Sequence, residues 1–350
     1  MQPAVARVTR AAAGPSRPET RDPTTRPRPS VLFPLVAFAL AAAGARSLAA
    51  RRSERVSARR LPVGPDGVIP GAGPIDLVGD GPHAVFMLHG FGDTPQTLVA
   101  LARHLHGRGF TVRVPLLPGH GRTLRDFARS GADEWIGFAR AELARFRDRH
   151  SDAMLVGLSM GGSLATILAA ETPDLPALAL VSPYVSMPTT IRRLARVYPL
   201  VALGIPYLAG GGERSIHDPA AQAESLGYGC CTPRLVAELA SVVARARRAL
   251  PALRMPTLVV QSREDNRIPP EAAERAFALL GAPERRLVWT ESGGHVLTVD
   301  HGRERVFSLV EEWLVSHARD AAAAAAAGAA RRGNRVGAAG GGGGTRGDAA

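Results

Sequence analysis

The stretch LVGLSMGGSLA, residues 155–165, contains the pattern Gly-x-Ser-x-Gly centred on Ser159. This pattern is typical of a serine held on a sharp turn between a strand and a helix, where its hydroxyl is exposed. The pattern alone is weak evidence. The chain has 38 glycines in 350 residues, so a chance match has a probability of about 0.2. The elements around Ser159 must therefore decide whether it is a nucleophile.

Strand and helix patterns alternate along the middle of the chain. Short apolar runs, typical of strands buried on both faces, occupy residues 84–88, 110–114, 153–157, 177–182, 257–262 and 286–289. Helical patterns fill the gaps, including residues 95–106, 132–149, 270–280 and 302–317. The alternation predicts an α/β fold, with a mostly parallel central sheet and helices on both of its faces.

Ser159 lies where this alternation predicts a change from strand to helix. It directly follows the strand predicted at 153–157 and precedes the helical segment SLATILAAE. Such a tight turn needs small neighbours, which Gly157 and Gly161 supply. The turn would leave the serine Oγ at the N-terminus of a helix, with backbone N–H groups aimed at a developing negative charge. The context predicts Ser159 as a nucleophile.

A serine nucleophile needs a base, and the base needs an orienting acid. In α/β folds that carry the serine on such a turn, the three follow in the chain order Ser, Asp or Glu, His. Asp265 follows the end of a predicted strand and is the candidate acid, with Glu264 as its competitor. His295 lies on a glycine-rich loop after the last predicted strand and is the candidate base. His301 and His317 lie on or beside the final predicted helix, and we expect them at the surface.

Stabilising an oxyanion requires two N–H donors. Met160, directly after the nucleophile, is expected to supply one. The segment LHGFGDTP, residues 88–95, follows an early strand, and Phe91 within it is the candidate for the second backbone donor. His120, in the turn PGHG, is interpreted as a structural residue beside the site.

The region 183–250 interrupts the alternation with several prolines and no clear strand. Its position between two sheet strands predicts a small helical cap over the strand ends, where α/β sheets bind ligands. Two interpretations are open and can hold together. The apolar residues of the cap either pack it onto the core or line an acyl pocket beneath a lid.

The net charge of +12 belongs to the two ends of the chain. Residues 1–61 hold 12 arginines against three acidic residues, residues 319–350 hold five against two, and residues 62–318 are neutral. The charge therefore does not indicate a nucleic-acid partner. The chain has no lysine, which excludes a phosphate-binding P-loop and a lysine Schiff base. Only the adjacent Cys230 and Cys231 occur, and no metal site or cofactor is expected.

Three segments follow from this composition: an Arg-rich tail at 1–61, a folded domain at 62–318, and an Ala/Gly-rich tail at 319–350 that is expected to be disordered. The apolar run at 31–45 is shorter than the ~20 residues of a membrane span. It is open to three interpretations: an interfacial anchor giving weak membrane association, an inefficient export signal, or an unstructured extension. Arginines directly after the run disfavour secretion, which leaves a cytoplasmic or membrane-associated protein.

The motifs HGF, LPGHG, GLSMGG and SGGHV, followed by an aspartate, resemble the bacterial carboxylesterase and monoacylglycerol-lipase-like branch of the α/β-hydrolase superfamily, the serine aminopeptidase S33 type. The similarity covers about residues 82–316. It implies hydrolysis of carboxylic esters with medium or long acyl chains through an acyl-serine, without a cofactor. Ser159, Asp265 and His295 match the triad, and Phe91 and Met160 match the oxyanion positions. One departure is Gly92-Asp93, where such relatives more often carry Thr-Gly. An acidic residue there can change substrate preference.

The same triad can serve other activities. Acyl transfer, thioester hydrolysis and peptide hydrolysis use the same geometry, and the sequence does not separate them. A different class is a non-catalytic ligand-binding protein on this fold, which would bind its ligand without turnover. Loss of catalysis usually removes a triad member, and none is missing here, so the sequence favours an ester hydrolase.

Overall fold

The computed structural model describes residues 32–210 and 215–318. The Arg-rich residues 1–31 and the Ala/Gly-rich tail at 319–350 lie outside the described residues. Internal contacts divide the chain into two units, Met1–Ala42 and Ala43–Ala350. Apart from the residues before Ala43, every helix, strand and contact described here belongs to the second unit.

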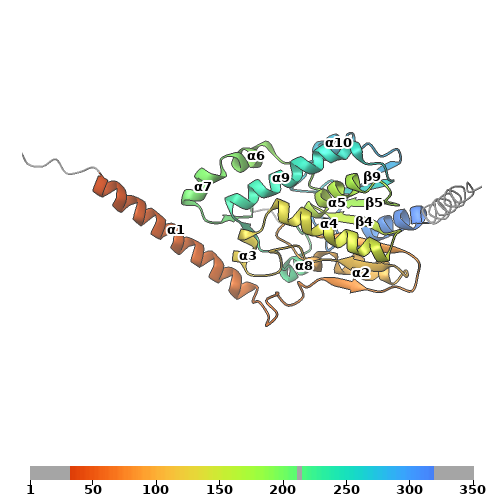
Figure 1. Ribbon diagram of the computed structural model, residues 1–350, viewed down its shortest axis with the longest axis horizontal. Helices are drawn as coiled ribbons and strands as arrows, with labels where there is room; N and C mark the ends of the chain where they lie inside the picture. The colour runs from red at the N-terminus through yellow and green to blue at the C-terminus, as the bar shows by residue number, and fades with distance from the viewer. Residues whose placement is uncertain (1–31, 211–214, 319–350) are drawn as a thin grey trace, which may run out of the picture. The chain divides into compact units, whose positions relative to one another are not determined.

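A seven-stranded sheet forms the centre of the fold, in the order β1-β3-β2-β4-β5-β8-β9 (Figure 1). Six strands are parallel, and β1 pairs with β3 in the antiparallel direction. The sequence did not predict β1, because three residues are too few to show a period. The strands are β1 (Ile75–Leu77), β2 (Ala84–Leu88), β3 (Thr111–Val114), β4 (Met154–Leu158), β5 (Leu178–Val181), β8 (Thr257–Ser262) and β9 (Arg285–Thr290).

Helices cover both faces of this sheet, which confirms the predicted α/β class. Alternate side chains of each strand point to opposite faces: Phe86 and Leu88 join one buried cluster, and Val85 and Met87 join the other. The first cluster is completed by α4 (Ala132–Arg149), α5 (Met160–Glu171), α9 (Pro233–Ala249) and α10 (Pro270–Phe277). The second is completed by α2 (Val99–His106) and the helix over residues 303–318.

Short elements connect this framework. Thr94 caps the turn before α2, its Oγ1 accepting from Gln96 N at 3.3 Å, and Pro95 follows in the first position. That turn is a 3₁₀ helix, η1 (Pro95–Leu98), rather than the first turn of an α-helix. The other connecting elements are α3 (Leu124–Arg129) and η2 (Leu250–Ala252).

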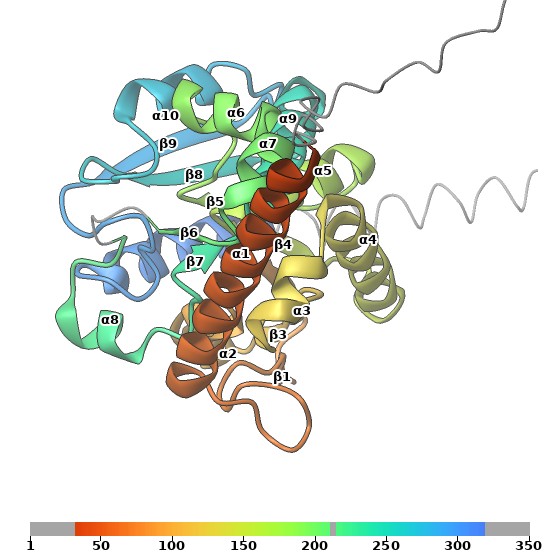
Figure 2. The same cartoon turned by 90° about the vertical axis from the view of Figure 1, so that its left-hand side faces the viewer.

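The region 183–250 contains the helices α6 (Thr189–Arg196), α7 (Tyr198–Gly204) and α8 (Pro219–Glu224) in addition to α9 (Figure 2). It also contains two strands that the sequence did not indicate, β6 (Leu208–Ala209) and β7 (Cys230–Cys231), which pair antiparallel. Strands of two residues carry no readable period. Helix α9 buries part of its surface in the core, whereas α7 has no buried residue.

The apolar run at 31–45 forms the beginning of a long helix, α1 (Leu32–Arg60). Its described part is therefore helical and not an unstructured extension. None of the helices within residues 32–210 and 215–318 combines the length and the hydropathy needed to cross a membrane. Beyond Ala42, α1 contacts the cap region: Arg46 Nε donates to Ala202 O at 2.6 Å, and Tyr207 Oη donates to Glu54 Oε1 at 3.2 Å.

The expectation that His317 lies at the surface is wrong. Its side chain is buried against Trp313, and its two ring nitrogens lie 2.8 Å from Trp313 O and 3.0 Å from Glu284 Oε1. The final helix places it on the face that packs against the sheet, which a lone polar residue in a helical pattern does not reveal. His301 is exposed, as expected.

Candidate active site

The turn at Ser159 joins β4 directly to α5 and holds the serine in an unusual backbone conformation. Its φ of 54° lies in the left-handed region, which side chains other than glycine rarely adopt. The two flanking glycines are required by space. A Cβ on Gly157 would lie 2.4 Å from Gly161 O, and one on Gly161 would lie 2.0 Å from Leu88 O. The sequence thus places a half-exposed hydroxyl at the start of a helix.

The three residues proposed as a triad meet at this turn. His295 Nε2 lies 2.7 Å from Ser159 Oγ, and His295 Nδ1 lies 2.8 Å from Asp265 Oδ2. Asp265 and His295 come from the loops after β8 and β9 and are both buried. Glu264, the competing acid, points away: its side chain is 53% exposed and lies 3.3 Å from His217. The structure therefore brings Asp265, and not Glu264, to His295.

The carboxyl group of Asp265 has further donors. Its Oδ1 accepts the N–H groups of Arg267 and Ile268 at 2.7 and 2.9 Å, and its Oδ2 accepts Gln261 Nε2 at 2.6 Å. Burial would raise the pKa of Asp265, but His295 and the two backbone donors outweigh it and hold the pKa below its usual value. The group is thus an ionised acceptor that orients the His295 ring. Gln261 was missed by sequence reasoning, although a polar residue inside an apolar strand run is a readable signal.

The loop carrying His295 is tied to a segment of the cap region, residues 215–218, here called the cap strap. The N–H groups of His295 and Val296 donate to Ser215 O at 2.8 and 3.1 Å. Asp300, which is buried, accepts four backbone N–H groups at 2.7 or 2.8 Å, those of His217, Asp218, Gly294 and His301. The position of His295 therefore depends on Asp300, the aspartate of the SGGHV motif, to which sequence reasoning gave no role of its own.

The loop after β2 borders the same site. The N–H groups of Phe91 and Met160 donate no hydrogen bond to any other described residue, so both are free to bind an oxyanion. The loop is fixed by the buried His89, whose Nε2 accepts Leu117 N at 3.1 Å while its Nδ1–H donates to Gly90 O at 3.0 Å. His120 is buried with its ring centroid 5.1 Å from that of His89, as expected of a structural residue.

Residues 81–302 of the chain match the family described as serine aminopeptidase, S33. The chain belongs to this family. The seven-stranded sheet and the order of its elements agree with that assignment, and they confirm the resemblance drawn from the sequence motifs.

Relatives of this S33-family protein include esterases and lipases. It is 27% identical to a thermostable monoacylglycerol lipase of Bacillus sp. (strain H-257), over 72% of its own length and 97% of the relative. It is 25% identical to a carboxylesterase of Bacillus subtilis (strain 168), over 67% and 93%. Among solved structures, one from work on two metagenome-derived lipolytic enzymes is 29% identical, with a TM-score of 0.66 and coverage of 71% and 100%. The chain is thus an α/β-hydrolase of esterase or lipase type.

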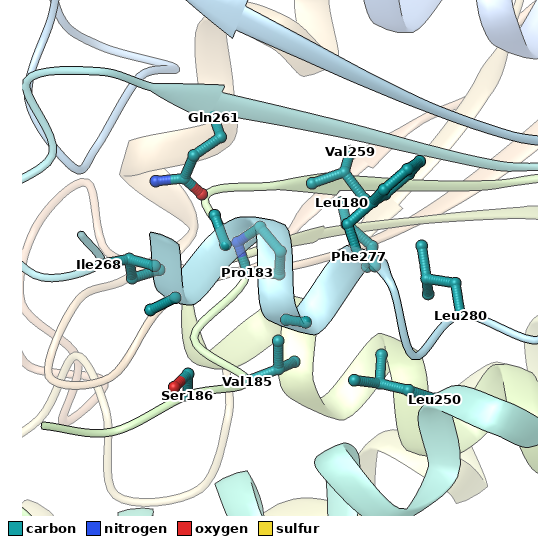
Figure 3. Close-up of a pocket in the computed structure, with 13 residues that line it drawn as sticks. Leu180, Pro183, Val185, Ser186, Leu250, Val259, Gln261, Ile268, Phe277 and Leu280 are labelled. Atoms are coloured by element: carbon teal, nitrogen blue, oxygen red, sulfur yellow. The ribbon is translucent and has the colours of Figure 1, made fainter. Parts of the chain in front are cut away.

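An apolar cavity of this S33-family protein lies between β5, β8 and α10 (Figure 3). Gln261 lies at one end of the cavity, close to Ile268, and apolar side chains such as Val259, Phe277 and Leu280 surround the rest. None of Ser159, Asp265 and His295 lines it. The cavity therefore adjoins Gln261, which donates to Asp265, and not the hydroxyl of Ser159.

Proposed function

We propose that this α/β-hydrolase cleaves carboxylic esters with medium or long acyl chains, monoacylglycerol-like esters among them, through an acyl-serine intermediate. The observation that carries the proposal is the chain of contacts from Ser159 Oγ to His295 (2.7 Å) and from His295 to Asp265 (2.8 Å). The relatives named monoacylglycerol lipase and carboxylesterase support the substrate class.

In the proposed reaction, Ser159 Oγ attacks the ester carbonyl while His295 Nε2 accepts its proton. Asp265 keeps the ring oriented and stabilises the imidazolium that forms. The N–H groups of Phe91 and Met160 bind the negative oxygen of the tetrahedral intermediate. His295 then returns the proton to the leaving alcohol, and a water molecule activated by the same histidine releases the acid.

The test is hydrolysis of p-nitrophenyl esters from C2 to C16 by the full chain and by Ser159→Ala. We expect a preferred acyl length in the wild type and a loss of about 10³-fold or more in the variant, because the nucleophile is removed. Ser308→Ala, a change in the final helix where the hydroxyl donates to Glu304 O at 3.1 Å, is the matched control.

Two results would contradict the proposal. Activity retained in pure Ser159→Ala protein would exclude an acyl-serine at this position. Ester binding without turnover, together with no labelling of Ser159 by a fluorophosphonate, would instead indicate a ligand-binding protein. A different outcome would identify acyl transfer: when an alcohol is added, the acyl group would appear as the ester of that alcohol instead of as the free acid.

A further inference from the structure

The carboxyl group of Asp93 opens onto the same space as the nucleophile. The point at which a Cβ would stand on Gly90 lies 3.2 Å from Asp93 Oδ2, 3.3 Å from Ser159 Cβ and 3.7 Å from Ser159 Oγ. Both Asp93 and Ser159 are half-buried, so both are accessible to a ligand. Because position 90 is glycine, this space contains no side chain of its own, and a substrate bound at Ser159 would lie beside the carboxyl group.

The cap region covers the other side of this carboxyl group. A Cβ on Gly227 would lie 2.6 Å from Asp93 Oδ1, and the N–H of Tyr228 donates to Gly92 O at 3.0 Å. Within the part of the chain that the structure describes, no side chain or backbone group donates a hydrogen bond to the Asp93 carboxyl, and no ion pair reaches it. A half-buried carboxylate normally has such a partner.

Two cationic or titratable groups face Asp93 at longer range, His295 from its loop and Arg267 from the loop of the acid. Arg267 Nε donates to Ser215 Oγ at 2.8 Å and forms no ion pair with Asp93. Burial raises the pKa of Asp93 to about 6, although His295 and Arg267 act in the opposite direction. At pH 8 the group is therefore mostly ionised.

A negative charge at this place has different effects on neutral and cationic esters. It repels the oxyanion that develops on any ester, because both charges lie in a partly dehydrated site. It attracts a positive group carried by the substrate, which would also give the carboxylate the partner that it lacks. Both kinds of ester experience the repulsion, and only a cationic ester has an attraction that offsets it.

We propose that Asp93 is a specificity-determining residue, which selects esters that carry an ammonium group a few bonds from the scissile carbonyl. The proposal rests on the ester hydrolysis proposed above. Gly90 leaves the space for the substrate, and Gly227 allows the cap to close over the carboxylate without filling it.

The test compares two esters of the same size and of the acyl length that the p-nitrophenyl series prefers: the choline ester and its neutral isostere, the 3,3-dimethylbutyl ester. We expect wild-type kcat/KM to favour the choline ester by about tenfold or more, and Asp93→Asn to reduce the ratio to near one. Glu264→Gln is the matched control, because it removes an exposed carboxylate next to Asp265. It should keep the wild-type ratio of kcat/KM for the two esters.

A second measurement needs no variant. The wild-type preference for the choline ester should grow as the pH rises through about 6, because Asp93 loses its proton there. A ratio near one at pH 8, or a ratio that Asp93→Asn retains, would overturn the assignment of Asp93 while Ser159-dependent hydrolysis still stands. If neither ester is hydrolysed and Ser159 is not labelled by a fluorophosphonate, the proposed hydrolase function fails together with this one.

Discussion

Ser159 shows how single residues of the site are held by their immediate neighbours. A residue with a side chain at φ 54° costs on the order of 1–3 kcal/mol, so the surrounding contacts must impose the conformation. They do so from both sides: Ser159 N donates to Val181 O at 3.0 Å, and Tyr184 N donates to Ser159 O at 3.0 Å. The strained turn is thus fixed by the strand β5 beside it and by the chain that follows that strand.

Asp265→Asn should reduce kcat by about 10³- to 10⁴-fold, because an amide can hold His295 in the wrong tautomer and cannot stabilise the imidazolium. Glu264→Gln should change kcat by less than about twofold, since its side chain is exposed and does not contact His295. Steady-state kinetics on the preferred p-nitrophenyl ester compares the two. A greater loss in Glu264→Gln would transfer the role of the acid to Glu264.

At the scale of elements, the site is assembled by the loops that follow β2, β4, β8 and β9, and the cap strap joins two of them. Ser215 accepts from the loop of the base through its carbonyl oxygen and from Arg267, in the loop of the acid, through its hydroxyl. The cap region therefore holds the loops of Asp265 and His295 in place. Helix α1 adds a support of its own to the cap through Arg46 and Glu54.

Removing α1 should lower stability without removing activity. Deletion of residues 1–42 keeps the contacts of Arg46, Glu54 and Arg60 with the cap region, whereas deletion of residues 1–60 removes them. Each exposed polar contact contributes up to about 1 kcal/mol. The chain that lacks residues 1–60 should therefore melt about 2–8 °C lower than the chain that lacks residues 1–42. Leu61, which belongs to the core, remains in both.

Thermal melts and ester hydrolysis of the two truncated chains, beside the full chain, provide the measurement. Glu54→Gln in the full chain should reproduce part of the loss, since Glu54 also pairs with Arg125 at 2.7 Å. Equal melting temperatures for the two truncations would mean that the contacts of α1 contribute nothing to the fold. Loss of activity in both would mean that α1 acts on the site itself.

At the scale of the whole molecule, buried carboxylates make stability depend on pH. Burial would raise the pKa of Asp300, but four backbone N–H groups outweigh it and hold the pKa below its usual value, and Asp265 is lowered in the same way by His295 and backbone donors. A carboxyl group whose pKa is depressed by folding stabilises the protein above its unfolded pKa, about 3.9. That contribution is lost as the pH falls through the lower folded value.

The melting temperature should therefore fall steeply below about pH 4, where these carboxylates take up protons. Asp300→Asn should lower stability by about 1–3 kcal/mol at pH 7, because its amide cannot accept all four N–H groups. The difference between variant and wild type should shrink as the pH falls. Melting curves from pH 3 to pH 8 for both chains test this, and a difference that does not change with pH would exclude Asp300 as a source of the acid sensitivity.

Much of the framework could be predicted from the sequence because its signals are local. Six of the seven strands of the main sheet, the helix over 132–149 and the turn at Ser159 follow from apolar periodicity and from glycine spacing. The short strands β1, β6 and β7 could not be predicted, because two or three residues carry no period. The burial of His317 also could not, since it depends on which face of the last helix meets the sheet.

The sequence by itself determined the α/β class and the turn that exposes Ser159, because each is set by residues close together in the chain. The chain order of a serine, an acid and a histidine can also be read directly from it. Only the tertiary structure decided that Asp265 and not Glu264 meets His295, that Gln261 and Asp300 support them, and that Asp93 faces the nucleophile without a partner among the described residues. The contacts of the site join loops far apart in the chain, 136 residues apart for Ser159 and His295, and they form because parallel strands bring their carboxyl ends to one edge of the sheet.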